Sequence, residues 1–107
     1  MRPIEWTGQG ARLIDQRLLP DREVWVDCRE LIDFEVAIRD MLIRGAPAIG
    51  ICAAYGLAVV ALQGQDLQAA AVRLAATRPT AVNLFWAIER MLKVWNGDPQ
   101  RMVREAV

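Results

Sequence analysis

The feature that most constrains the fold is an uncharged run from Ala46 to Leu62, in the middle of the chain. The run is apolar on every side of a helix, and it carries small residues that let neighbouring helices approach closely: Gly50, Ala53, Ala54 and Gly56. It is shorter than the roughly 20 apolar residues that cross a bilayer. We therefore expect a central helix, from just after Pro47 to about Gln63, that is buried among other helices.

One helix is expected before this run and another after it. From Glu30 the apolar residues recur with helical spacing, and Gly45 marks the end of this first helix. Its expected core face comprises Leu31, Phe34, Ile38, Met41 and Leu42. A third helix, from about Leu67 to Thr77, must end before Pro79, because the residue before a proline disfavours helical backbone.

A fourth helix is predicted in the segment TAVNLFWAIERMLKVWNG, with Thr80 as its N-cap and Gly97 as the glycine at its C-cap. Its expected core face comprises Leu84, Ile88, Met91 and Trp95. Asp98 and Pro99 are typical of the first positions of a fifth helix. Because no stop signal follows before Val107, we expect the chain to belong to a longer protein.

The first thirty residues have the pattern of strands and turns. Pro20 and Asp21 are typical of a turn, and the segment REVWVDC alternates apolar residues with others, as a strand with one buried face does. We expect a small antiparallel three-stranded meander over about residues 1–29, followed by a helical bundle over about residues 30–107. This is an α+β fold in a single amino-terminal domain.

The charge balance and the residue types exclude several kinds of site. Thirteen Lys and Arg residues balance thirteen Asp and Glu residues, so a nucleic-acid partner or an acidic membrane is not indicated. The absence of histidine excludes His-dependent triads and most zinc sites, and we expect neither a metal nor a cofactor. Cys28 and Cys52 lie in apolar surroundings without a CxxC spacing, which favours structural burial. The chain does not open on a signal-peptide pattern, so we expect a cytoplasmic protein.

Arg44 and Arg78 occupy equivalent places, each in a short linker before a helix and within three residues of a proline. Helix N-termini expose unpaired N–H groups that bind phosphate, and an arginine just ahead adds a forked, permanently charged donor. Gly45 can take a positive φ and allow an oxygen ligand to approach, while Thr80 and Asn83 add a hydroxyl and an amide at the second helix start. Alternatively, each arginine caps the preceding helix or pairs with a surface carboxylate, and the spacing alone leaves both interpretations open.

Two motifs, MLIRGAPAIGICAAYGLAV and ATRPTAVNLFWAIERM, resemble the amino-terminal domain of the methylthioribose-1-phosphate isomerase family. The wider family includes regulatory subunits of initiation factor 2B. The segments RPIEW and LIDQRLLP also match, so the resemblance covers essentially the whole chain. Members of this family are several-fold longer than this chain.

The resemblance implies that Arg44, Gly45 and Ala46 form one substrate-binding segment and that Arg78 forms a second, both for a sugar phosphate. The family converts the aldose S-methyl-5-thio-α-D-ribose 1-phosphate into the ketose S-methyl-5-thio-D-ribulose 1-phosphate, in methionine salvage. Its acid and base are a cysteine and an aspartate in a Rossmann-like carboxyl-terminal domain, beyond Val107. We therefore expect no catalytic residue in this chain, no isomerase activity of the chain alone, and a homodimer of the full-length enzyme.

Two alternatives share this fold. A regulatory subunit like those of initiation factor 2B would bind and assemble without turning over a sugar phosphate. A ribose 1,5-bisphosphate isomerase would use a related site and differ mainly in how it reads the 5-position of the sugar. The intact segments RGAPAIG and TRPTAVNL favour an enzyme, because a regulatory subunit has no need of both arginines.

Overall fold

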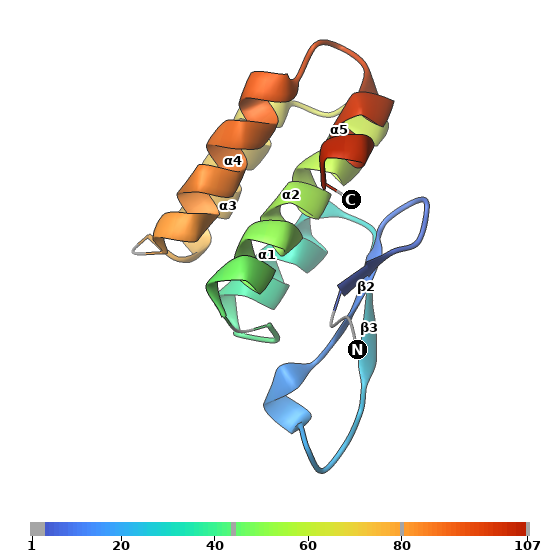
Figure 1. Ribbon diagram of the computed structural model, residues 1–107, viewed down its shortest axis with the longest axis vertical. Coiled ribbons are helices and arrows are strands. Elements are labelled where there is room, and N and C mark those ends of the chain that lie inside the picture. Colours follow the sequence, from blue (N-terminus) through green and yellow to red (C-terminus); the bar gives the residue numbers. More distant parts are fainter. Residues whose placement is uncertain (1–3, 44, 80, 107) are drawn as a thin grey trace.

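A computed structural model describes residues 4–43, 45–79 and 81–106 (Figure 1). Within these ranges a three-stranded antiparallel sheet precedes five α-helices. The helices form a bundle, and the sheet lies at one side of it, extending past its lower end in the view of Figure 1. The expected α+β architecture is confirmed.

The sheet is a meander of β1 (Ile4–Trp6), β2 (Ala11–Ile14) and β3 (Trp25–Cys28), in the order β1-β2-β3. Gly10 begins the second pairing, and a Cβ at this position would lie 2.2 Å from the carbonyl oxygen of Cys28. Only glycine therefore fits there. A short 3₁₀ helix, η1 (Gln16–Leu18), follows β2, and the Asp15 carboxylate at its N-cap accepts hydrogen bonds from Arg17.

The bundle consists of α1 (Leu31–Arg39), α2 (Ala46–Leu62), α3 (Leu67–Thr77), α4 (Val82–Val94) and α5 (Pro99–Ala106). As predicted, α2 is central, because it packs against all four other helices and against β1. Gly56 allows α2 to approach α1 closely: a Cβ there would lie 3.2 Å from the Cβ of Phe34. Within the described ranges, no helix combines the length and the hydropathy that a bilayer crossing requires.

Three details of the predicted helices are wrong, and one cannot be compared. Met41 lies outside α1, is 43% exposed and has a φ of 62°, because the chain turns away from the helix after Asp40. Trp95 is the C-cap of α4 with extended backbone, so it leaves the core face and is 37% exposed. Gly97 does adopt a positive φ of 93°, but in the loop after that cap and not as the C-cap glycine. The proposed N-cap Thr80 lies outside the described residues, and Ala81 is the N-cap of α4.

Candidate functional site

The structure brings the two predicted binding segments to one cavity. Gly45, just before α2, and Arg78, just before α4, both line this cavity, together with Met41 and Asn83. Its volume is about 430 Å³, which lies within the range of roughly 300–1,000 Å³ that is usual for small-molecule sites. We call it the Arg78 cavity.

Both helices that begin at this cavity lack a capping side chain on the N-cap residue. Gly45 is the N-cap of α2 and Ala81 is the N-cap of α4, and neither residue has a side-chain acceptor. By contrast, Asp66 caps α3 by accepting from the N–H of Ala69, and Glu30 takes part in a capping box at α1. The starts of α2 and α4 therefore retain first-turn N–H groups that an external acceptor can use.

Gly45 has the backbone conformation that its place in the sequence predicts. Its φ is 89°, a value that side chains with a Cβ rarely adopt, and no atom lies within 4 Å of the place where a Cβ would stand. Its carbonyl oxygen accepts the hydrogen bond of the Ile49 N–H, which closes the first turn of α2. The chain thus turns sharply into α2 and leaves open space beside the helix start.

Arg78 is half-buried at the end of α3, and its carbonyl oxygen accepts a hydrogen bond from the Ala81 N–H. Its guanidinium forms no ion pair with any residue that the structure describes. The interpretation of Arg78 as the partner of a surface carboxylate therefore finds no support among those residues.

The remaining members of the predicted first segment are less well defined. Arg44 lies outside the described residues, so its position relative to the cavity is not established. Ala46 is the first residue of α2. Gly45 and Arg78 are the predicted site residues that line the cavity.

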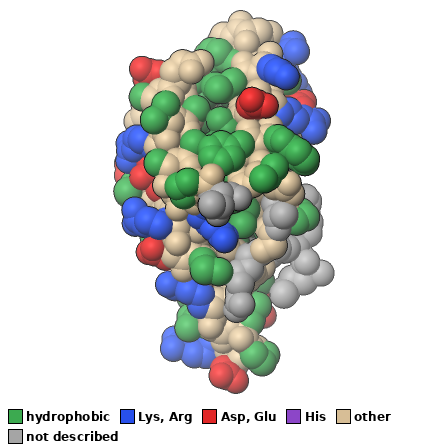
Figure 2. Space-filling model, turned by 90° about the vertical axis from the view of Figure 1, so that its left-hand side faces the viewer, with side chains coloured by type: hydrophobic (Ala, Val, Ile, Leu, Met, Phe, Trp, Pro, Cys, Tyr) green, Lys and Arg blue, Asp and Glu red, His purple; other side chains and the backbone are tan. Residues whose placement is uncertain are grey.

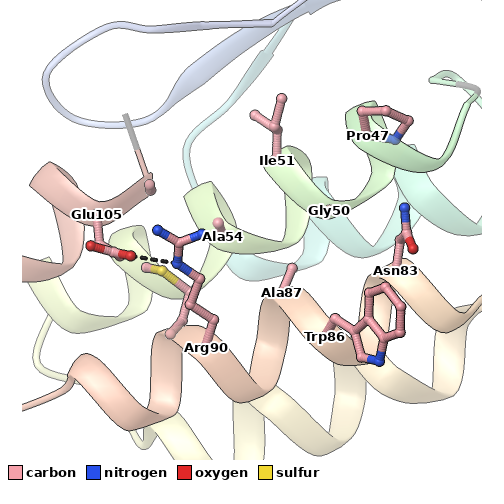
Figure 3. Close-up of a pocket in the computed structure, with 11 residues that line it drawn as sticks. Pro47, Gly50, Ile51, Ala54, Asn83, Trp86, Ala87, Arg90 and Glu105 are labelled. Atoms are coloured by element: carbon pink, nitrogen blue, oxygen red, sulfur yellow. Dashed lines mark hydrogen bonds and ion pairs between the residues drawn. The ribbon is translucent and has the colours of Figure 1, made fainter.

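A second hollow, the α2–α4 groove, adjoins this cavity (Figure 3). Pro47, Ile51 and Ala54 line it from α2, and Trp86 and Ala87 line it from α4. At its far end the Arg90 guanidinium forms an ion pair with the Glu105 carboxylate of α5. Asn83 lines both the groove and the Arg78 cavity, which makes it the residue that the two hollows share.

Hydrophobic side chains are exposed beside the groove. Trp86 is 65% exposed and Val82 is 56% exposed, both on α4. Figure 2, which looks onto the side of the bundle where α3 and α4 lie, shows hydrophobic side chains in the middle of that side and charged ones around them. This side therefore combines an apolar surface with the neighbouring cationic cavity.

The titratable groups do not supply an acid or a base at the Arg78 cavity. Among the described residues that line it, none is a carboxylate or a thiol. Burial, with Asp33 and Asp27 nearby, raises the pKa of the Cys28 thiol to about 12, and burial raises the pKa of Cys52 well above its ordinary value. Both thiols are therefore poor nucleophiles. No cluster of three metal-binding side chains occurs in the described part of the chain.

Comparison with known proteins identifies the family. Residues 42–106 match the Initiation factor 2 subunit family. The chain belongs to this family. The matched region includes both linkers that precede α2 and α4, so the Arg78 cavity lies in the part of the chain that family members share.

Individual members of the Initiation factor 2 subunit family carry two kinds of name. A methylthioribose-1-phosphate isomerase from Alkalilimnicola ehrlichii is 49% identical over 108 residues, covering 92% of this chain and 31% of the relative. The crystal structure of 5-methylthioribose 1-phosphate isomerase from Pyrococcus horikoshii OT3 matches with a TM-score of 0.88 at 35% identity, over 98% of this chain and 34% of that one. Translation initiation factor eIF-2B, subunit delta, from A. fulgidus matches with a TM-score of 0.89 at 37% identity, over 99% and 35%. The chain thus spans about a third of the length of these relatives.

The sequence analysis noted the amide of Asn83 but not its position between two hollows. It also missed the exposure of Trp86, because the helical pattern of this family member places that residue beside the core face without showing what covers it. A signal was present in both cases: an amide and an indole one turn apart in the first half of α4, on a helix with a clearly separate apolar face.

Proposed function

We propose that this chain is the amino-terminal, phosphate-binding part of a methylthioribose-1-phosphate isomerase, in which the Arg78 cavity holds the substrate phosphate. The full-length protein then converts the aldose phosphate into the ketose phosphate. The observation that carries the proposal is the convergence of Gly45 and Arg78 on one cavity, in a chain whose relatives include proteins named for this reaction.

The chemistry of the cavity supports binding of an anion. The Arg78 side chain brings a permanent positive charge and a planar pair of donors, which matches two oxygens of a phosphate. The uncapped starts of α2 and α4 add N–H groups and the positive ends of two helix dipoles. Arg44 precedes Gly45 directly and belongs to the same proposed site.

The proposal assigns the chemical steps to the rest of the protein. The ring of a sugar 1-phosphate cannot open spontaneously, because its anomeric oxygen carries the phosphate, so an acid and a base must act in a closed site. The described lining of the Arg78 cavity contains neither. We propose that a carboxyl-terminal domain supplies both groups and covers the cavity, in a cytoplasmic homodimer, and that residues 1–107 alone have no activity.

The test is to replace the arginines in the full-length protein and to measure formation of the ketose product. Arg78→Ala should lower kcat/KM by roughly ten- to a hundredfold, which corresponds to the 1.5–3 kcal/mol of a charged hydrogen bond. Arg44→Ala should have an effect of the same size. Lysine at either position should restore little, because it keeps the charge but loses the planar fork.

Arg101→Ala is the matched control, because Arg101 is exposed on α5 and lines neither the Arg78 cavity nor the α2–α4 groove. This variant should keep normal kinetics. If Arg78→Ala lowers the melting temperature but leaves kcat/KM per folded molecule unchanged, Arg78 is a structural residue and the proposed phosphate site is wrong.

A regulatory subunit is the second candidate, because the structure of eIF-2B subunit delta from A. fulgidus matches this chain as well as the isomerase structure does. The two functions differ in turnover. A full-length protein that forms no ketose from methylthioribose 1-phosphate, yet associates stably with other subunits, would favour this candidate. Turnover of ribose 1,5-bisphosphate in preference to the methylthio substrate would indicate the third alternative.

A further inference from the structure

Asn83 occupies a place between two chemically different hollows. It lies in the first turn of α4, and its amide extends toward Pro47 at the start of α2 (Figure 3). On one side the Arg78 cavity offers a cation, and on the other the α2–α4 groove offers the apolar side chains of Ile51 and Trp86. A ligand that reaches from one hollow to the other must pass this amide.

The backbone at Asn83 is held by a close helix crossing. A Cβ at Gly50 of α2 would lie 3.5 Å from the carbonyl oxygen of Asn83 and 3.5 Å from the Cβ of Ala87. The two helices therefore touch at this point with almost no side chain between them. The position from which the Asn83 amide extends is fixed by packing rather than by a loop.

The amide has no structural task among the residues that the structure describes, because its side chain makes no hydrogen bond with any of them. Other amides in the chain do have one: Asn96 accepts from the N–H of Asp98, and Gln63 donates to the carbonyl oxygen of Arg29. A half-buried amide that makes no protein hydrogen bond is available to bind a ligand.

The chemistry of an amide selects hydroxyl groups rather than phosphate. Asparagine offers two N–H donors and a carbonyl acceptor side by side, which matches a hydroxyl that both donates and accepts. It carries no charge and thus adds little to the binding of an anion compared with Arg78. The order of the hollows, a cation and then an amide and then an apolar groove, matches a sugar with a phosphate at one end, hydroxyls in the middle and an apolar substituent at the other.

We propose that Asn83 is a specificity-determining residue that binds a ring hydroxyl of the sugar phosphate, with the apolar substituent directed along Ile51 and Trp86. This inference rests on the proposed function, because it takes the phosphate to lie in the Arg78 cavity. It adds a contact that distinguishes a sugar phosphate from phosphate alone.

The test compares two probes on the full-length protein by calorimetry: ribose 1-phosphate and inorganic phosphate. Asn83→Ala should weaken binding of ribose 1-phosphate by roughly three- to tenfold, the range of one or two neutral hydrogen bonds, and leave inorganic phosphate within about twofold. Gln68→Ala is the matched control, because Gln68 holds the same helix position in α3 but is exposed and lines neither hollow. It should change neither affinity.

A measurement on the unaltered protein guards against a folding defect in the variant. With ¹⁵N-labelled asparagine, the side-chain amide signal of Asn83 should shift on addition of ribose 1-phosphate and stay in place with inorganic phosphate. Equal weakening of both probes by Asn83→Ala, no weakening of either, or an unmoved amide signal would each overturn the assignment.

The outcomes also separate this inference from the proposed function. If inorganic phosphate binds and Arg78→Ala abolishes that binding, the phosphate site stands whatever Asn83→Ala does. If inorganic phosphate fails to bind, or binds independently of Arg78, the phosphate site falls and the role of Asn83 falls with it.

Discussion

Two glycines of α2 should respond in opposite ways to the same substitution. At Gly50 an added methyl group would meet its nearest neighbours, Ala87 Cβ and the Asn83 carbonyl oxygen, at 3.5 Å, which is ordinary van der Waals contact. Alanine in a helix interior is favoured over glycine by about 0.5–1 kcal/mol. Gly50→Ala should therefore stabilise the protein by about that amount.

At Gly56 the same methyl group would lie 3.2 Å from both the Cβ and the Cγ of Phe34. Phe34 is fully buried in the core, so it has little room to move away. Overpacking of this kind costs about 1–3 kcal/mol, which outweighs the gain in helix propensity. Gly56→Ala should destabilise the protein by about 0.5–2 kcal/mol, so the two variants should differ by roughly 1–3 kcal/mol.

Equilibrium unfolding in urea measures this difference directly, and both variants should unfold with the same dependence on denaturant, so that only the midpoint moves. Because both glycines lie inside α2 and receive the same methyl group, the intrinsic helix term is common to both variants. A Gly56→Ala protein that is as stable as the Gly50→Ala protein would refute the packing argument.

Two further predictions concern ionisable groups. The hydrogen bond from Arg17 lowers the pKa of Asp15 below its ordinary 3.8, so this pair stabilises the fold above about pH 4, and the stabilisation is lost as the pH falls through the lower, folded-state pKa. Asp15→Asn should therefore cost about 1–2 kcal/mol at pH 7 and progressively less between pH 4 and pH 2, as followed by urea unfolding at each pH. Burial and the raised pKa values of Cys28 and Cys52 predict that iodoacetamide at pH 8 labels neither thiol in the folded protein and both in denaturant, as counted by mass spectrometry; rapid labelling of the folded protein would contradict this.

The parts of the fold that follow from local chemistry could be predicted from the sequence. The run without charges could only be a buried central helix, and Pro79 fixed the end of α3 at Thr77. Gly45 could be assigned a positive φ because it joins one helix to the next just ahead of a proline. In each case one residue type has few conformations open to it.

The errors arise where a helical pattern continues past the end of the helix itself. Met41 and Trp95 keep the spacing of a buried face, but the backbone has already left the helix at Asp40 and at Val94. Spacing alone does not show this, because the cause is the turn that each loop makes toward the next helix. Likewise, the place of Asn83 between two hollows depends on how α2 crosses α4, which no local pattern specifies.

The central position of α2 has a consequence for the order in which the chain can fold during synthesis. This helix leaves the ribosome before α4 and α5, yet it packs against both of them. Until those helices follow, the Gly- and Ala-rich surface of α2 has only part of its cover, and exposed apolar surface of this kind promotes aggregation. Nascent chains that end after α3 should therefore depend on chaperones, and protection should come only once α5 has emerged and folded back along α2.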